Sequence, residues 1–246
     1  MKIAFASVVF LFTASCAAAQ DKGDPTITEI WNPVPKVIEA GKSYGGASSD
    51  AIVLYSTKKD SSNWSGINGK PFGWLADDSS LTVMPSKGDI QTKQAFGDCQ
   101  LHIEWRTPLG VKGTGQDRGN SGIFFMGRYE LQVLDNFNNV TYSNGQAGSI
   151  YKQRMPLVNV CRKPGEWQTY DVIFTAPVFY DNGMLKSAAR ITVLQNGVLV
   201  QNNVEIWGAT TYIGVAKYEK HSSKEPLILQ DHSHKVSYRN IWVREL

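Results

Sequence analysis

The sequence predicts an all-β protein, a jelly-roll sandwich of two antiparallel sheets. After residue 20 no useful window keeps the 3.6-residue apolar period of an amphipathic helix. Instead, roughly ten or more short runs rich in β-branched and aromatic residues alternate with turn signals such as Asn-Gly and Lys-Gly. The chain has 246 residues, 42% of them hydrophobic, and no low-complexity linker, which favours one large domain. Together these observations indicate a double-sheet jelly roll.

Residues 1–19 have the layout of a secretory signal peptide. A single early Lys precedes an apolar run and then small residues, with cleavage expected after Ala19. The segment is too short for a spanning helix, so we expect a periplasmic or extracellular protein with no transmembrane segment in the mature chain. Alternatively, residues 13–16 form a poor lipobox in which Cys16 would be lipidated.

Residues 20–50 contain three prolines in their first half and no sustained period, so we expect an extended lead-in. The domain is expected over 51–246, opening with a strand at 51–55. Short β runs separated by Gly turns follow up to residue 98. Trp64 and Trp74 in this part are expected to be core anchors.

The stretch 100–135 reads as strand, glycine-rich loop, strand, tight turn and strand. In its first strand, apolar residues at 101, 103 and 105 alternate with His102, Glu104 and Arg106. In its third strand, Glu130 and Gln132 form the polar face, and the alternation breaks before Asp135. The break predicts a β-bulge that turns Asp135 toward the side of Glu130. We expect these polar faces to line one sugar-binding cleft.

The second half of the chain begins with a long polar excursion over 136–167, whose glycines, amides and aromatics suit the rim of a carbohydrate cleft. A strand follows over 167–174, and Asn196-Gly197 predicts a hairpin between 189–194 and 198–201. The region 207–224 has no clear period. Beyond it, Gln230 and His232 share one strand face, and 236–243 resembles a central strand.

The net charge and the cysteines limit which classes of ligand and metal site are expected. The net charge of +3 is small and the basic residues are scattered, so nucleic acid is not expected and a small carbohydrate is. Cys99 and Cys161 could form a disulfide or remain buried thiols. Without a CxxC or a His pair, a structural zinc site is not expected. His232 with Asp231 or Glu130 could bind a divalent cation, but the spacing alone does not support such a site, so no cofactor is expected.

Several long segments carry a resemblance to a known family. The segments GDIQTKQAFGDCQLHIEWRTP, GNSGIFFMGRYELQVLD, NGQAGSIY, PGEWQTYDVIF, LQNGVLVQNNVEI and LQDHSHKVSYRNIWVREL closely resemble the 3-keto-disaccharide hydrolase family, formerly a domain of unknown function. The resemblance covers roughly residues 52–246. It implies a concanavalin A-like jelly roll with a concave ligand face. It also implies an exported bacterial enzyme that acts on glycosides oxidised to a ketone at C3.

That chemistry assigns roles to the polar residues. A ketone at C3 acidifies the C2 proton, so the C1–O bond can break by β-elimination, after which water adds. The reaction needs a base, a partner for the enolate oxygen and an acid for the leaving oxygen. We expect Glu130 or His232 as base, Arg106 or Asn120 as enolate partner, and Asp135 or Glu104 as acid. The expected substrate-binding residues also include Gln132, Gln146, Tyr151, Gln230 and Asp231.

Other interpretations of these residues stay open. The stretch 130–135 resembles the E-x-D-x-x-E strand of laminarinase-type β-glucanases, but Gln132 and Asp135 depart from it, which makes a plain glucanase mechanism doubtful. Glu104 and Arg106 could be ion pairs on a solvated face, Asn120 a turn residue, and Asp231 with His232 a loop pair; His221 and His234 are expected at the surface.

Two non-catalytic functions are alternatives to the enzyme. The main one is a carbohydrate-binding jelly-roll module, because the same fold serves lectins and fold does not decide function. It would bind unmodified sugars without turnover. An interaction or structural domain is the third possibility.

Overall fold

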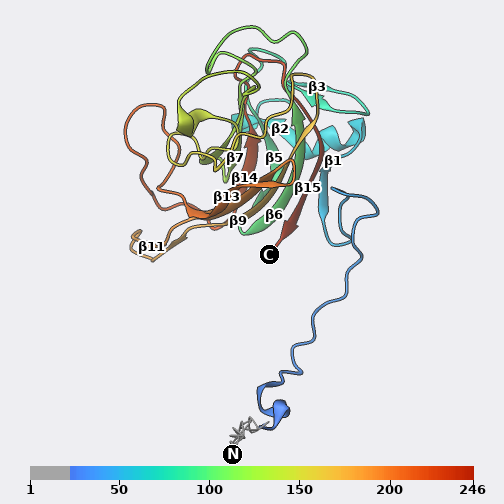
Figure 1. Ribbon diagram of the computed structural model, residues 1–246, viewed down its shortest axis with the longest axis vertical. Helices are drawn as coiled ribbons and strands as arrows, with labels where there is room; N and C mark the ends of the chain where they lie inside the picture. The colour runs from blue at the N-terminus through green and yellow to red at the C-terminus, as the bar shows by residue number, and fades with distance from the viewer. Residues whose placement is uncertain (1–22) are drawn as a thin grey trace, which may run out of the picture. The chain divides into compact units, whose positions relative to one another are not determined.

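The computed structural model describes residues 23–246, whose strands form two main antiparallel sheets (Figure 1). The chain divides into two compact units, Met1–Val37 and Ile38–Leu246. The described part of the first unit contains the 3-10 turn η1 (Pro25–Thr28), and all the strands belong to the second. The signal peptide and the lipidation of Cys16 concern residues outside the described chain and stay predictions. In residues 23–246 no helix is long and apolar enough to span a membrane.

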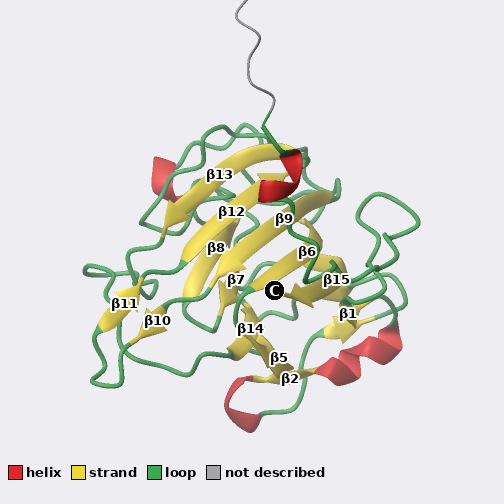
Figure 2. Ribbon diagram, turned by 90° about the horizontal axis from the view of Figure 1, so that it is seen from below, coloured by secondary structure: helices red, strands yellow, loops and turns green. Residues whose placement is uncertain are grey.

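The larger sheet has eight strands, seven of them in one hydrogen-bonded path, and Figure 2 shows β13, β12, β9, β6 and β15 side by side. In order the path is β13 (Val198–Glu205), β12 (Arg190–Gln195), β9 (Gln168–Thr175), β6 (Cys99–Arg106), β15 (Ser237–Glu245), β4 (Leu81–Thr82) and β3 (Leu75–Ala76). The eighth strand, β1 (Ile52–Tyr55), pairs with β15.

The smaller sheet has five strands. In order they are β2 (Trp64–Gly66), β5 (Ile90–Phe96), β14 (Glu225–Leu229), β7 (Ser121–Phe125) and β8 (Tyr129–Val133). A separate hairpin joins β10 (Val178–Phe179) to β11 (Leu185–Ser187), and three further 3-10 turns are η2 (Lys58–Asn63), η3 (Ile67–Gly69) and η4 (Ser143–Gly145). The predicted jelly-roll sandwich is confirmed.

The core lies between the two sheets, because each long strand turns one pleat face inward. On β6 the inward residues are Leu101, Ile103 and Trp105, all fully buried. The neighbouring strands add aromatic contacts, such as the stacked rings of Phe125 and Phe174 with centroids 4.7 Å apart. The outer faces of the two sheets consequently point in opposite directions, and this decides where the polar residues lie.

Several local predictions are confirmed. Trp64 and Trp74 are core residues, 2% and 5% exposed. Asn196 and Gly197 join β12 to β13 with φ angles of 53° and 80°, the positive values that a tight hairpin turn requires. Of the two interpretations of the cysteines, free thiols hold: Cys99 is buried and Cys161 half-buried.

The β-bulge predicted before Asp135 is wrong. Strands β7 and β8 pair in continuous register from Phe125–Tyr129 to Ser121–Val133, and β8 ends at Val133. The alternation therefore breaks because the strand has ended there.

Candidate active site

The outer face of the five-stranded sheet carries the polar residues of β8. Glu130 and Gln132 point away from the core, because the intervening residues of β8 face the other sheet. Across the ladder, Glu130 pairs with Phe124 and Gln132 with Gly122. A Cβ atom at Gly122 would lie 2.7 Å from Oε1 of Glu130. A glycine is therefore needed at this position for the carboxyl group to have room.

This face is the floor of a hollow of about 280 Å³, here called the Glu130 hollow. Strands β7 and β8 and four loop segments contribute its lining, which consists of Asn120, Phe124, Glu130, Gln132, Tyr151, Thr210, Tyr212, Gln230 and His232. A second hollow of about 320 Å³, the tyrosine hollow, is lined by Gln116, Asp117, Asn120, Tyr142, Tyr151, Lys152, Tyr212 and His232. Because four residues line both, the two hollows adjoin.

The loops that form the walls of the Glu130 hollow are hydrogen-bonded to β8, which is the edge strand of the five-stranded sheet. The amide of Tyr151 donates to the carbonyl of Glu130 (3.2 Å), and the amide of Gln132 donates to the carbonyl of Ser149 (3.0 Å). From the other loop, the hydroxyl of Thr210 accepts from the amide of Glu130 (3.1 Å). The segments around 151 and 210 are thus fixed to the strand that carries the carboxyl group.

Glu130 is a buried acid without a cationic partner. Glu130 is only 5% exposed. No Lys, Arg or His of residues 23–246 forms an ion pair with its carboxyl group. Burial, with a smaller effect of the Asp89 carboxylate, raises the pKa of Glu130 to about 8. Such a group can gain or lose a proton near neutral pH.

The carboxyl group of Glu130 contacts the amide group of Gln132. In one orientation of that amide, its nitrogen lies 3.0 Å from Oε1 of Glu130 and 3.1 Å from the carbonyl oxygen of Ser121; in the other, its nitrogen donates to Oε1 of Gln116 at 3.0 Å. Gln132 is 1% exposed and Asn120 is 4% exposed. The floor of the Glu130 hollow thus combines one carboxyl group with buried amides.

Five other predicted site residues surround this carboxyl group. Asn120, Gln132, Tyr151, Gln230 and His232 all line the Glu130 hollow. Asn120 also takes part in a turn, since its amide donates to the carbonyl of Gln116 (2.8 Å). His232 is exposed at the rim, where its ring stacks on His234 with centroids 6.0 Å apart.

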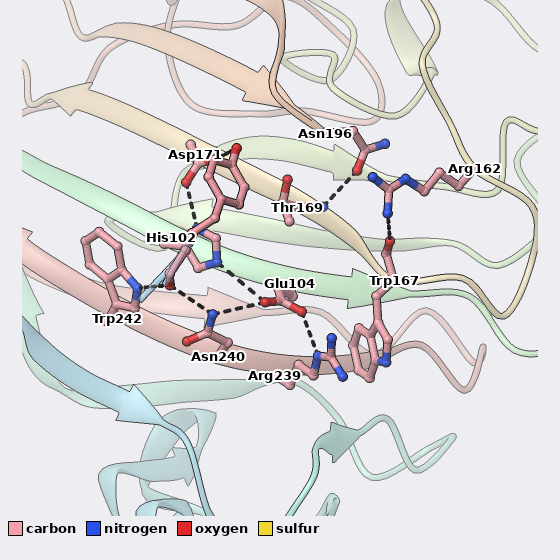
Figure 3. Close-up of polar contacts among 12 residues, drawn as sticks. His102, Glu104, Arg162, Trp167, Thr169, Asp171, Asn196, Arg239, Asn240 and Trp242 are labelled. Carbon is pink, nitrogen blue, oxygen red and sulfur yellow. Dashed lines mark hydrogen bonds and ion pairs between the residues drawn. The ribbon is translucent and has the colours of Figure 1, made fainter. Parts of the chain in front are cut away.

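Glu104 and Arg106 do not share this hollow, so the prediction of one common cleft is wrong for them. Both lie on β6, in the eight-stranded sheet, and point outward on the other side of the sandwich. Figure 3 shows Glu104 among partners: Nε of Arg239 donates to it at 2.6 Å and Nδ2 of Asn240 at 3.0 Å. The guanidinium of Arg106 stacks on the ring of Trp167, 4.5 Å from its centroid.

The electrostatics of Glu104 are the reverse of those of Glu130. Burial opposes ionisation, but His102, whose Nε2 lies 3.8 Å from Oε1 of Glu104, and hydrogen bonds from Asn240 and Arg239 outweigh it and lower the pKa of Glu104 to about 2. His102 itself is fully buried and its Nδ1 lies 2.6 Å from Oδ1 of Asp171. Glu104 is therefore a permanently charged member of a paired network.

Three more predicted residues lie outside both hollows. Asp135 is 1% exposed and forms an ion pair with Nε of Arg118 at 2.7 Å, beyond the end of β8. Asp231 accepts hydrogen bonds from the amides of Gly88 (3.0 Å) and Ser233 (2.9 Å), so it shapes its own loop. Gln146 is half-buried and lines neither hollow.

The sequence prediction missed Thr210 and Tyr212. They lie in the region 207–224, which has no period because the segment is a loop that borders the hollows. Within residues 23–246, no group of three or more His, Cys, Asp and Glu is arranged to hold a metal ion.

Comparisons with known proteins relate this chain to a family. Residues 51–244 match the model of a family described as a 3-keto-alpha-glucoside-1,2-lyase-like domain. A presumed glycosyl hydrolase from Parabacteroides distasonis ATCC 8503 is 50% identical, with a TM-score of 0.86, and the match covers 91% of this chain and 97% of that one. Among curated proteins none matches.

Two further structures from the same organism, described in the same words, are more distant. They are 18% and 20% identical to this chain, each with a TM-score of 0.54. The matches cover 80% of this chain and 94% and 99% of the other chains. At this identity they show a shared fold alone.

Proposed function

Because the chain belongs to the family of 3-keto-alpha-glucoside-1,2-lyase-like domains, we propose that it cleaves 3-keto-glucosides or 3-keto-disaccharides. The reaction is elimination across C1 and C2 followed by addition of water at C1, which is net hydrolysis. The observation that carries the proposal is Glu130, a buried carboxyl group without a cation on the floor of a hollow. The name of the 50% identical relative, a presumed glycosyl hydrolase, agrees with an enzyme that acts on glycosides.

Glu130 acts as the base in this proposal. It takes the C2 proton, and the electron pair left on C2 delocalises into the C3 ketone as an enolate. A base works best when its pKa lies near the working pH, and the pKa of Glu130 is raised to about 8 by burial. An ordinary exposed glutamate, with a pKa near 4.3, would be a much weaker base.

The buried amide of Asn120 stabilises the enolate. Asn120 lines the same floor, and its amide nitrogen makes one hydrogen bond, to the carbonyl of Gln116, so its second N–H can donate to the C3 oxygen as negative charge develops on it. Of the two enolate partners expected from the sequence, Asn120 is retained, because Arg106 lies on the opposite sheet.

The leaving oxygen needs an acid on the other side of the ring. In an α-glucoside the C2 hydrogen and the C1 oxygen are both axial and lie on opposite faces, so one residue cannot serve both. We assign the acid to His232, because it lines both hollows. It therefore borders the place where a glycosidic bond would pass from one hollow to the other. When the enolate collapses, the C1–O bond breaks, the proton of His232 goes to the departing oxygen and an enone remains. Water then adds at C1.

The direct test is incubation of the purified protein with 3-keto-trehalose and with unoxidised trehalose, each with and without chelator. We expect the two halves to be released from the oxidised sugar alone. Glu130→Gln should lower kcat/KM by about 10² to 10⁴, the usual contribution of a positioned acid or base. Binding of trehalose itself without any cleavage of the oxidised sugar would instead identify a carbohydrate-binding module.

A further inference from the structure

The structure contains a second hollow to which the catalytic proposal assigns no part of the substrate. We propose that the tyrosine hollow is the subsite for the departing half of the substrate, and that it selects a neutral sugar ring over a small alcohol. This inference rests on the proposed function, because it takes the Glu130 hollow as the site of the 3-keto ring. It adds a specificity for the leaving group.

The arrangement of the hollows suits a two-part ligand. Their volumes of about 280 and 320 Å³ are each near the lower end of the range for small-ligand sites. They share Asn120, Tyr151, Tyr212 and His232. A bond that joins one ring in each hollow would therefore cross between these four side chains, next to the proposed acid.

The lining of the tyrosine hollow has the chemistry that sugar rings bind. Three tyrosines supply aromatic faces for the C–H surface of a ring and hydroxyl groups for its polar edge. Two of them are joined, since the hydroxyls of Tyr142 and Tyr151 lie 2.6 Å apart. The third, Tyr212, is 72% exposed, so much of its ring is free for a ligand.

The charges in the lining favour a neutral ligand. Lys152 is a cation and Asp117 an anion among the lining residues, and His232 adds a positive charge while it holds the proton that the proposed function assigns to it. The ammonium of Lys152 is also partly occupied: it donates to the carbonyl of Tyr212 and lies 4.2 Å from the centroid of that ring. A cationic leaving group would lie near Lys152 and an anionic one near Asp117, so either charge would have an unfavourable neighbour. The hydroxyl groups of a sugar can form hydrogen bonds with both side chains.

Two observations indicate that the tyrosine hollow is preformed. The side chain of Gln116 donates to the hydroxyl of Thr141 (2.9 Å) and to the carbonyl of Gly145 (2.8 Å), which fixes the turn that carries Tyr142. A Cβ atom at Gly145 would lie 2.0 Å from the ring of Tyr142. The ring can therefore fold over its own turn only because residue 145 is glycine.

The test compares two substrates that differ only in the leaving group, 3-keto-trehalose and methyl 3-keto-α-glucoside. Tyr142 is the residue to change, because it lines the tyrosine hollow and not the Glu130 hollow. Tyr142→Ala should lower kcat/KM for the disaccharide about tenfold and leave the methyl glycoside unchanged. Tyr142→Phe, which keeps the ring, should stay within about threefold of the wild type on both substrates.

Tyr180→Ala is the matched control. Tyr180 is also an exposed tyrosine with a lysine, Lys186, 5.9 Å from its ring, but it lines neither hollow, so neither substrate should be affected. Equal loss on both substrates in Tyr142→Ala, or no loss on either, would overturn the subsite while the proposed function stands. A wild-type protein that cleaves neither oxidised substrate would overturn the proposed function, and the subsite with it.

Discussion

Glu104 and Glu130 are the same residue type, each on the polar face of a strand, yet they have opposite environments. Glu104 accepts hydrogen bonds from Arg239 and Asn240, and its pKa is about 2. Glu130 is more deeply buried with one amide beside it, and its pKa is about 8. A buried charge with partners is part of the scaffold, whereas a buried carboxyl group without a cation is poised to exchange a proton.

The sharpest way to break this comparison is to neutralise each carboxyl group in turn. Glu130→Gln should lower kcat/KM on a 3-keto-glucoside by a factor of about 10² to 10⁴. The melting temperature should stay unchanged or rise, because no ion pair is lost. Steady-state kinetics and a thermal melt of the same preparation measure both quantities. Full activity in this variant would end the assignment of Glu130 as base.

Glu104→Gln is the mirror experiment on the other sheet. We expect a loss of about 2 kcal/mol or more in the free energy of unfolding, because Arg239 loses a charged acceptor and the fully buried His102 loses the carboxylate that lies 3.8 Å from its Nε2. The value of kcat/KM should stay within about threefold of the wild type, a change of under 1 kcal/mol in the barrier. Urea unfolding followed by fluorescence gives the stability. A stable protein without activity would place Glu104 in the reaction after all.

Gly122→Ala probes the room that Glu130 needs. The added methyl group would lie 2.7 Å from Oε1 of Glu130, so the carboxyl group must shift. We expect kcat/KM to fall about tenfold and stability to fall by about 1 kcal/mol, the usual result of overpacking. A variant with wild-type kinetics would show that the position of this carboxyl group does not matter.

The pH dependence of stability should distinguish the two carboxyl groups, because their contributions have opposite signs. The pKa of Glu130 is raised from 4.5 to about 8, so its contribution to stability is complete below pH 4.5 and is lost as the pH rises through 8. The pKa of Glu104 is lowered from 4.5 to about 2, so its contribution is complete above pH 4.5 and is lost as the pH falls through 2.

Melting curves of the two Gln variants across this range check these signs. Relative to the wild type, Glu130→Gln should gain stability toward pH 9, and the deficit of Glu104→Gln should shrink toward pH 2. In the wild type, kcat/KM should follow a bell-shaped pH profile, because Glu130 must be ionised and His232 protonated; the raised pKa of Glu130 sets the rising limb. Variant curves that run parallel to the wild type would contradict the pKa values on which the comparison depends.

Much of the architecture could be read from local patterns. Alternation of apolar and polar residues placed Glu104 and Glu130 opposite the core, and Asn196-Gly197 marked its hairpin, because both signals depend only on neighbouring residues. The break in alternation before Asp135 led to the wrong prediction of a β-bulge, since the end of a strand and a bulge disturb the alternation in the same way. The loop with Thr210 and Tyr212 was missed because loops lack a period.

The sequence by itself determined which side of its own strand each residue occupies, since the pleat has a period of two and needs no partner. Only the tertiary structure decided that β6 and β8 belong to different sheets, because strand pairing joins residues far apart in the chain. That choice set Glu104 among cations and put Glu130 in the hollow under the loops around Tyr151 and Thr210. The environment of Glu130 is therefore a product of long-range pairing, whereas the outward direction of its side chain is a local property.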